Sequence, residues 1–504
     1  MDTANNETIL VTGASGFIGR HLVSALLPKF TIIAFARRTQ KEAGVKSHPN
    51  LVWVLVDIMD ETQFITAFKE ADQAYHIDYI FHLAAYYHFG DQVDSDVYQV
   101  TNVDATRILL DLARAAKIKR FIFTSSLVAS KFPENDDRVC EKSELNATFP
   151  YALTKHQGEK MVREASLDFP CTIVRLAAVY SDWCEYEPLY NFLKVWLSER
   201  WDARMIPGEG SMSIPYINVS CIITMFEKIL EKSEDLDQLT IFLASSDRPV
   251  ALKKLFTLAT RYYYGKERTP IHIPVIIAKI GVIFRDLRGR LLGKRPFEKL
   301  WMMEYIDKQF HTDCSYTRQT LDWYPKDRHH IGRRILHLIE NMKSRPDEWD
   351  RKNIDRLQRF EVNRPALTLA EEMVRRREEI VEVIYREIVD QRYKKQFPFY
   401  QGLPPEDLRW NIHVVFNNLL ASVRHGDRSM MMTFARDLSQ RRMEQGVSLD
   451  ELCGALTIIR DTITKILYSE PRLTDIKLQV HDNIYLAIQL SMDEIKDEYE
   501  AVPR

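Results

Sequence analysis

Tyr151 and Lys155 lie four residues apart, and their side chains can take part in the same proton transfer. On a helix this spacing puts both side chains on one face. A free phenol has a pKa of about 10, and a neighbouring ammonium group stabilises the phenolate and moves that pKa toward working pH. Ser126 ends an apolar run 25 residues before the tyrosine, where its hydroxyl can hydrogen-bond the same substrate oxygen. By itself, however, a Tyr-x-x-x-Lys pair is usually a surface helix pair.

A glycine pattern near the N-terminus, Gly13, Gly16 and Gly19, favours the catalytic interpretation. It follows the apolar run 9–11 and precedes the amphipathic segment 20–27, which gives the order strand, tight turn, helix. Glycines let such a turn approach a pyrophosphate, and amide N–H groups at the helix start receive the anion. The alternative is an ordinary glycine-rich turn. We predict that the pyrophosphate of a dinucleotide is held by Gly13, Ser15, Gly16, Phe17, Ile18 and Gly19, and that the catalytic residues are Ser126, Tyr151 and Lys155.

The next β-type run, residues 31–36, ends in Arg37 and Arg38, where NAD-selective sites usually carry an acidic residue for the ribose hydroxyls. Two guanidinium groups suit a 2′-phosphate instead. We therefore expect NADP as the coenzyme, with NAD as the alternative. The competing interpretation is that both arginines only solvate the end of a strand.

Strand-like and helix-like segments alternate through the first third of the chain. The expected strands are 9–11, 31–36, 51–56, 79–83, 120–124 and 172–176, and the expected helices are 20–27, 61–71, 103–116 and 151–165. This alternation predicts an α/β fold with a Rossmann-like, doubly wound parallel sheet covered on both faces. A small substrate-binding subdomain is expected mainly from residues 182–343.

At these positions the chain resembles the extended branch of the short-chain dehydrogenase/reductase superfamily, over roughly residues 7–344. The matching pieces include residues 12–19, 82–85, 101–103, 124–126, 151–155 and 175–180, and residues 321–325 resemble a closing Leu-Gly-Trp-x-Pro segment with Asp322 in place of the glycine. The resemblance implies that Asp57 and Ile58 hold the adenine and that Ala84 and Ala85 line the coenzyme backbone. It also implies that Asn102 supports the coenzyme side of the site and that Lys155 binds the nicotinamide ribose.

The sequence differs from the family pattern at positions that are expected to lie near the substrate. Sugar-nucleotide members often carry Val-Tyr-Gly and Val-Asp-Asp where this chain has Val128-Ala129-Ser130 and Val219-Ser220-Cys221. Arg37 and the apolar segment 274–284 look more like reductases of the dihydroflavonol or hydroxysteroid type. We expect an NADP-dependent oxidoreductase acting on a small-molecule carbonyl or alcohol. The alternatives are a nucleotide-sugar epimerase or dehydratase with tightly bound NAD, and a non-catalytic dinucleotide-sensing regulator, against which the retained Ser126, Tyr151 and Lys155 argue.

Strand signals stop at the polar, proline-marked segment 344–352. We expect a dehydrogenase domain at 1–345, a linker at 346–364 and an all-α helical bundle at 365–504. The expected helices of the bundle are 369–391, 406–425, 429–445, 448–468 and 473–498, and Ser448 with Glu451 has the form of a capping box. The bundle shows no metal-ligand spacing and no nucleophile with a base, so we predict no metal site and no chemistry there.

Residues 435–452 are similar to the globin-like but haem-free N-terminal domain of RsbT co-antagonist proteins of the RsbRD type. The resemblance implies a sensing or assembly role. Such domains often pair through helices, so we expect a homodimer and a protein partner for this domain.

Composition excludes several other classes. A net charge of −2 gives no electrostatic case for nucleic acid binding. The six cysteines are scattered, and the N-terminus lacks the pattern of a signal peptide, so we expect a cytoplasmic protein. The apolar segment 274–284 is short and contains Lys279, which predicts a substrate-lid helix rather than membrane contact, and no stable membrane insertion.

Overall fold

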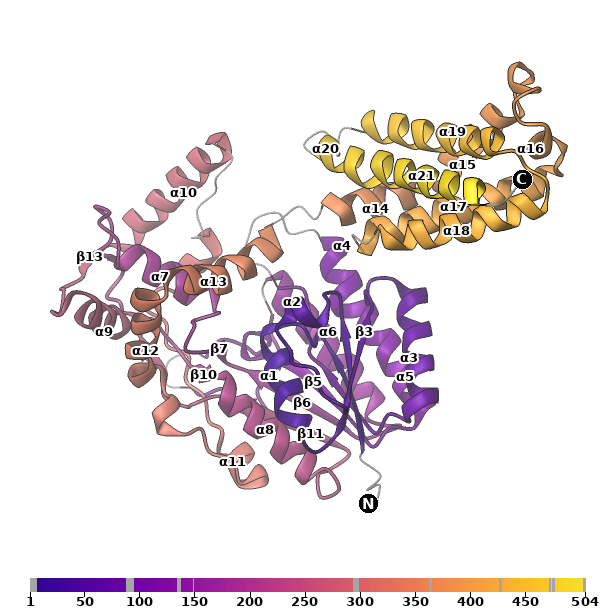
Figure 1. Cartoon of the computed structure of the whole chain (residues 1–504). Coiled ribbons are helices and arrows are strands. Elements are labelled where there is room, and N and C mark those ends of the chain that lie inside the picture. Colours follow the sequence, from indigo (N-terminus) through magenta and orange to yellow (C-terminus); the bar gives the residue numbers. More distant parts are fainter. Residues whose placement is uncertain are drawn as a thin grey trace. The chain divides into compact units, whose positions relative to one another are not determined.

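The computed structural model describes residues 7–87, 95–133, 137–147, 149–292, 299–361, 365–425, 428–470, 473 and 476–501. The chain divides into two compact units, Met1–Glu361 and Val362–Arg504. Figure 1 follows the chain through both units in order of colour, from indigo to yellow.

Unit 1 is built on a seven-stranded sheet in which every neighbouring pair of strands is parallel. Its strands are β1 (Thr8–Thr12), β2 (Thr31–Ala36), β3 (Leu51–Leu55), β4 (Tyr79–His82), β5 (Arg120–Ser126), β6 (Cys171–Leu176) and β11 (Leu239–Ala244), in the order β11-β6-β5-β4-β1-β2-β3. The strand order reverses between β1 and β4. In open α/β sheets, ligands bind outside the carboxyl ends of the strands at this switch point.

Alternate residues of each central strand belong to two different hydrophobic clusters, so the sheet is buried on both faces. In β1, Ile9 and Val11 pack with one cluster, and Leu10 packs with the other. The helices of this layer are α1 (Phe17–Leu26), α2 (Gln40–Ala43), α3 (Glu61–Tyr75), α4 (Ser95–Tyr98), α5 (Ala105–Ala116), α6 (Pro150–Ala165) and α8 (Val219–Glu231). Residues of α1 and α8 share the first cluster, and residues of α3, α5 and α6 share the second. The predicted doubly wound fold is confirmed.

The rest of unit 1 forms a smaller body with its own core. Short strands pair as β7 (Ala178–Tyr180) with β10 (Tyr216–Asn218), β8 (Met205–Pro207) with β13 (Ile271–Ile273), and β9 (Ser213–Ile214) with β12 (Val250–Ala251). Its helices include α7 (Glu187–Trp196), α9 (Leu252–Tyr264), α12 (Ile331–Ser344) and α13 (Pro346–Glu361). The segment expected as a linker is therefore helical as far as Glu361, and Trp349 of α13 joins the core of this body. Residues 362–364 lie outside the described residues.

Helix α11 (Ser315–Leu321) ends at the family-like segment 321–325. Asp322 caps it in the left-handed conformation, with φ of 46°. This conformation favours glycine, which is the residue that the family segment usually has here. Aspartate adopts it more readily than most other residues, so Asp322 can replace the glycine. Trp323 then turns into the core and donates its indole N–H to the carbonyl oxygen of Cys221 at 3.0 Å.

Helix α10 (Val275–Leu292) contains most of the apolar segment expected as a lid. Its buried residues Ala278 and Val282 pack with Met303 of the 3-10 helix η3 (Leu300–Tyr305). Nowhere in the described ranges is a helix both long enough and apolar enough to cross a membrane.

Unit 2 is helical, and most of its helices contribute to one large cluster of buried apolar residues among those that the structure describes. Its helices include α14 (Pro365–Arg375), α15 (Arg377–Val389), α16 (Pro398–Gly402), α17 (Pro405–His425), α18 (Ser429–Glu444), α19 (Leu449–Tyr468), α20 (Lys477–Val480) and α21 (Leu486–Ala501). The expected helix 369–391 is interrupted at Arg376, and the expected helix 473–498 contains a π-helical turn at His481–Tyr485. Residues 474 and 475 lie outside the described residues.

Only half of the expected capping box forms. The Ser448 hydroxyl accepts the Glu451 N–H at 3.2 Å, but the Glu451 carboxylate accepts the backbone N–H groups of Phe399 and Tyr400 at 2.7 and 3.1 Å. Glu451 therefore ties α19 to α16 rather than closing its own helix.

Candidate active site

The loop between β1 and α1 and the first turn of α1 have no room for a side chain at Gly13 or Gly19. Gly13 has φ of +70°, and a Cβ built there would lie 2.8 Å from the backbone nitrogen of Ala84. A Cβ at Gly19 would lie 2.3 Å from the carbonyl oxygen of Gly13. No side chain caps α1 at Gly16. The loop therefore presents bare backbone at the start of a helix, which fits the pyrophosphate of a dinucleotide.

The structure separates the two arginines that follow β2. The Arg38 guanidinium donates a hydrogen bond to the carbonyl oxygen of Ser15, so it lies against the glycine loop. The indole N–H of Trp53 holds the Arg38 carbonyl oxygen at 2.9 Å. Arg37 is exposed. Of the two predicted coenzyme residues, only Arg38 is brought to the loop.

Two further segments predicted to face the coenzyme lie after the carboxyl ends of β3 and β4. The carboxylate of Asp57 accepts the Met59 N–H at 3.1 Å, and the side chain of Ile58 is buried. Ala84 and Ala85 are half-buried, and the Ala84 N–H donates to the hydroxyl of Thr12 at 3.3 Å. Together with the glycine loop, these segments surround the switch point of the sheet.

Helix α6 places the predicted acid-base pair. Lys155 is buried, and its Nζ donates to the carbonyl oxygen of Thr124 at 2.8 Å. The same Nζ lies 5.8 Å from the centre of the Tyr151 ring. Burial lowers the pKa of Lys155 from 10.5 to about 7, although Glu159 opposes the shift. The lysine is therefore poised to change its charge near neutrality.

Ser126 ends β5, two residues after the carbonyl that holds Lys155. Its hydroxyl oxygen accepts only a long hydrogen bond, 3.5 Å, from the Val128 N–H. Its position is thus at the carboxyl end of the strand next to α6, where a substrate oxygen could be shared with Tyr151.

A buried ion pair that the sequence-based prediction missed fixes α6 to the sheet. Glu159 lies one turn after Lys155, and its carboxylate pairs with Arg175 of β6 through two hydrogen bonds of 3.0 and 2.9 Å. Both side chains are fully buried. The Ser125 hydroxyl donates a further bond of 2.6 Å to Glu159. The only signal in the sequence is the four-residue spacing from Lys155, because the partners belong to other strands.

Asn102 links two elements of the site, and its predicted support of the coenzyme side remains a prediction. It lies in the π-helical segment η1 (Gln99–Asp104), and its amide accepts the Tyr86 N–H at 2.6 Å and donates to the Tyr86 carbonyl at 2.9 Å. The same amide donates to the Thr154 hydroxyl at 3.0 Å. Asn102 therefore joins the loop after β4 to α6, so it positions the site. In the same loop, the ring of Tyr87 packs edge-on against Tyr151 with centroids 4.5 Å apart.

His82 is a buried group at the site that the sequence-based prediction also missed. Its ring nitrogens lie 2.7 Å from the Thr12 hydroxyl and 2.9 Å from the Thr106 hydroxyl. Burial, with the charge of Lys155 as the smaller cause, lowers the pKa of His82 to about 3. His82 is thus a neutral residue that ties β1 to α5.

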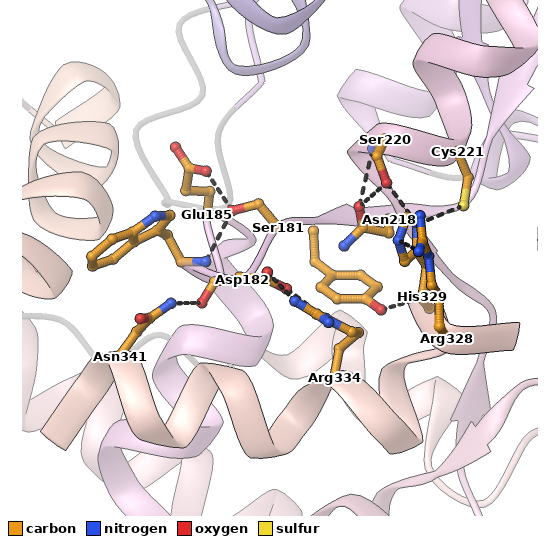
Figure 2. A network of polar contacts seen from close by, with 12 residues as sticks. Ser181, Asp182, Glu185, Asn218, Ser220, Cys221, Arg328, His329, Arg334 and Asn341 are labelled. Carbon is orange, nitrogen blue, oxygen red and sulfur yellow. Dashed lines mark hydrogen bonds and ion pairs between the residues drawn. The ribbon is translucent and has the colours of Figure 1, made fainter. Parts of the chain in front are cut away.

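Figure 2 shows a second polar network, which includes Ser181, Glu185 and His329. An ion pair outside that view joins it to α1. Arg20, directly after the glycine loop, pairs with the carboxylate of Glu185, which also accepts the Ser181 hydroxyl at 2.6 Å. Glu185 has φ of 51°, and Cys184 before it has φ of 73°. Non-glycine residues rarely adopt this conformation, so the network holds a strained turn beside the predicted coenzyme loop.

The far end of the network contains a serine, a histidine and a cysteine. The Ser220 hydroxyl donates its proton to Asn218 Oδ1 at 2.7 Å and not to the histidine, so the group is not arranged as a nucleophile with a base. His329 Nδ1 lies 2.7 Å from the Ser220 hydroxyl and 3.5 Å from the Cys221 sulfur. Burial raises the pKa of Cys221 and lowers the pKa of His329. The thiol therefore stays protonated and the imidazole neutral, as suits structural groups.

Comparison with known proteins agrees with this geometry. Residues 9–243 match the model of the NAD dependent epimerase/dehydratase family, and residues 378–480 match the RsbT co-antagonist protein rsbRD N-terminal domain. A dTDP-D-glucose 4,6-dehydratase of Dictyostelium discoideum is 28% identical over 250 residues, which are 45% of this chain and 56% of that protein. An uncharacterized UDP-glucose epimerase of Bacillus subtilis is 29% identical over 257 residues, covering 49% of this chain and 79% of that protein. This chain thus spans little more than half of the first relative.

Solved structures of low identity share the fold. UDP-glucose 4-epimerase of Thermotoga maritima, solved with UDP-glucose, matches with a TM-score of 0.52 at 21% identity, covering 67% of this chain and 99% of the other. dTDP-glucose 4,6-dehydratase of Bacillus anthracis, solved with NAD, matches with a TM-score of 0.52 at 15% identity, covering 69% and 99%. The family match over residues 9–243, together with the fold, identifies unit 1 as an extended short-chain dehydrogenase/reductase. More particularly, the chain carries a domain of the NAD-dependent epimerase/dehydratase family followed by an RsbRD N-terminal domain, as the sequence predicted.

Proposed function

We propose that unit 1 is an NADP-dependent oxidoreductase that interconverts a carbonyl and a hydroxyl group on a small molecule. The observation that carries this proposal is the buried Lys155, held 5.8 Å from the Tyr151 ring beside a backbone cradle that excludes side chains. In a Tyr-x-x-x-Lys pair without a function, the ammonium group would be expected to lie in solvent. Burying it costs free energy unless the charge is paired or takes part in binding or catalysis.

The residues divide the work as follows. Tyr151 gives a proton to the substrate oxygen during reduction and takes it back during oxidation. Lys155 stabilises the phenolate when it is charged and binds the ribose of the coenzyme. Ser126 holds the same substrate oxygen in place. The nicotinamide coenzyme supplies the hydride, and its pyrophosphate would rest on the loop of Gly13 and Gly19.

The preference for NADP rests on Arg38. Its guanidinium lies on the carbonyl of Ser15, where it can meet a 2′-phosphate, and a guanidinium binds phosphate through charge-assisted, paired hydrogen bonds.

The second candidate is a nucleotide-sugar epimerase or dehydratase with tightly bound NAD. The names of the relatives favour it, since a dTDP-D-glucose 4,6-dehydratase and a UDP-glucose epimerase are among them. The two candidates differ in stoichiometry. A reductase consumes NADPH as product forms, whereas an epimerase or dehydratase converts its substrate with no net use of coenzyme. Conversion of dTDP-glucose or UDP-glucose by the purified protein without added coenzyme would favour the second candidate.

The decisive variants are Tyr151→Phe and Lys155→Met, assayed with NADPH and a panel of ketones and aldehydes. Tyr151→Phe is expected to lower kcat by about 10²- to 10⁴-fold and to leave NADPH affinity nearly unchanged, because the phenol acts on the substrate. Lys155→Met is expected to reduce both. A Tyr151→Phe protein that keeps most of its rate would require another proton donor. If wild type binds NADPH and turns over neither ketones nor nucleotide sugars, a non-catalytic dinucleotide sensor becomes the better description.

For unit 2 the proposal is regulation or assembly without bond making. The resemblance to RsbRD N-terminal domains supports a role in pairing two chains or binding a protein partner. No group of His, Cys, Asp and Glu residues suited to a metal ion occurs within the described parts of the chain.

A further inference from the structure

Helix α10 exposes a row of large apolar side chains that the fold leaves uncovered. Six of them are between 51% and 73% exposed: Ile276, Ile277, Ile280, Ile283, Phe284 and Leu287. At about 100° per residue they fall within an arc of about 120° on the helix. The opposite side is the one that packs, through Ala278 and Val282. Proteins in water rarely leave such a continuous apolar strip open unless something binds it.

Positive charge accompanies this strip, although the chain as a whole has a net charge of −2. The sequence of α10, Val275–Leu292, carries four basic residues and one acidic residue, a local net charge of +3. Lys279 is exposed beside the strip, on the side away from Phe284. A continuous apolar strip on a helix of net positive charge is the pattern of a helix that lies in the headgroup region of an anionic bilayer.

We propose, against the sequence-based expectation of a substrate lid, that α10 docks unit 1 on the surface of an anionic lipid bilayer. This inference is independent of the proposed activity. The helix has 18 residues, or about 27 Å, and it carries charges, so it lies along the surface rather than across the membrane. Its isoleucines and Phe284 enter the boundary between headgroups and acyl chains, and the ammonium and guanidinium groups pair with lipid phosphates.

A second copy of the chain suits this surface less well. In a two-fold dimer the same patch meets itself, so a helix of net charge +3 would face another of the same sign. Lipid phosphates and carboxylates are complementary to it.

The docking helix is also connected to the catalytic helix. Met303 of η3 packs under α10, and Trp301 of η3 stacks on Phe149 with ring centroids 5.0 Å apart. Phe149 is the N-cap residue of α6, two residues before Tyr151. Two packing contacts, one between α10 and η3 and one between η3 and Phe149, therefore connect the docking helix to the helix that carries Tyr151 and Lys155.

The test is co-sedimentation of the full chain with phosphatidylcholine vesicles, with and without phosphatidylserine. Wild type is expected to bind the vesicles that contain phosphatidylserine and to release them as ionic strength rises. The double substitution Ile280→Gln and Phe284→Gln is expected to weaken binding about tenfold or more, because two apolar side chains no longer enter the lipid. Lys279→Gln is expected to weaken it about fivefold.

The matched control replaces two exposed apolar residues outside α10, Leu167→Gln and Trp201→Gln, and should bind vesicles as wild type does. All of these positions are exposed, so the variants are expected to keep the wild-type circular dichroism spectrum and thermal midpoint. Vesicle binding that is absent in wild type, or equal in wild type and the α10 double variant, would overturn the proposal. A change from dimer to monomer in the α10 variant, without vesicle binding by wild type, would identify the strip as a contact between copies and would overturn it as well.

Discussion

At the scale of single residues, two neighbouring arginines lie in different surroundings. Arg38 reaches back to the carbonyl of Ser15, while Arg37 points to solvent and is exposed. Since a 2′-phosphate sits near the end of the second strand in dinucleotide sites, the guanidinium that already touches the glycine loop is the better partner.

The first prediction concerns this difference. Wild type should bind NADPH more tightly than NADH, and Arg38→Ala should remove about 1.5–3 kcal/mol of that preference, because a charge-assisted contact is lost. Arg37→Ala is the matched control and should keep most of the preference. Fluorescence titration of both coenzymes into the three proteins measures it. Equal affinity of wild type for the two coenzymes would remove the case for NADP.

A second residue-scale property is the titration of Lys155. Its pKa is lowered from 10.5 to about 7 by burial, so between these values the unfolded chain binds more protons than the folded chain. The contribution of Lys155 to the free energy of unfolding therefore rises with pH across this window. It is lowest at pH values below about 7, where the buried lysine is protonated in the folded chain.

We expect this contribution to disappear in Lys155→Met. The stability of wild type relative to Lys155→Met should increase as pH is raised from 7 toward 10, because other titrating groups are common to both proteins. Thermal unfolding of the two proteins at a series of pH values measures the difference. A difference that stays constant over that range would mean that Lys155 titrates at its ordinary pKa.

At the scale of elements, α6 is the helix on which the site depends. The ion pair between Glu159 and Arg175 fixes its middle to β6, and the bond from Asn102 to Thr154 fixes its start to η1. Lys155 lies between Thr154 and Glu159. Tyr151 lies one turn before Lys155, and its carbonyl oxygen accepts the Thr154 hydroxyl at 2.9 Å, so both positions follow from these anchors.

Glu159→Gln should destabilise unit 1 by roughly 3 kcal/mol, because it leaves the Arg175 charge buried without its carboxylate. Glu231→Gln on α8 is the control. It removes the carboxylate of an exposed pair with Lys228 and should leave the unfolding midpoint unchanged. Chemical denaturation followed by circular dichroism compares the two. Equal midpoints for Glu159→Gln and wild type would show that the buried pair does not hold the helix.

At the scale of the whole molecule, the chain consists of two units that each have their own hydrophobic cores. The boundary that contacts define lies after α13, later than the polar segment suggested. Trp349 and Asn353 of α13 are both buried, and Asn353 donates to the Trp183 carbonyl at 2.8 Å. Helix α13 therefore completes unit 1.

This boundary gives a prediction for fragments. Residues 1–361 should fold alone and bind NADPH, whereas residues 1–345 should be less stable, because Trp349 no longer covers the core around Tyr190. Residues 365–504 should fold alone and form a dimer, as expected for an assembly domain. Thermal melts and mass measurement in solution test all three fragments. A monomeric 365–504 would remove the case for pairing through unit 2, and an insoluble 1–361 would mean that unit 2 completes the enzyme.

The sequence by itself determined what depends on short spacing. The glycine pattern defined a strand, turn and helix, and the four-residue spacing put Tyr151 and Lys155 on one helical face. Runs of apolar residues likewise defined the strands of a parallel sheet and the helices of unit 2. These features are local, because the period of a helix or strand fixes which side chains share a face before any packing occurs.

Only the tertiary structure decided which distant groups meet. The pairing of Glu159 with Arg175, the placement of Asn102 between Tyr86 and Thr154, and the choice of Arg38 over Arg37 all depend on the order of strands in the sheet. The same holds for α10, since its sequence is apolar on most sides and only its packing leaves one strip uncovered. Periodicity specifies the faces of an element, but the arrangement of elements in space selects the face that is buried and the charges that are paired.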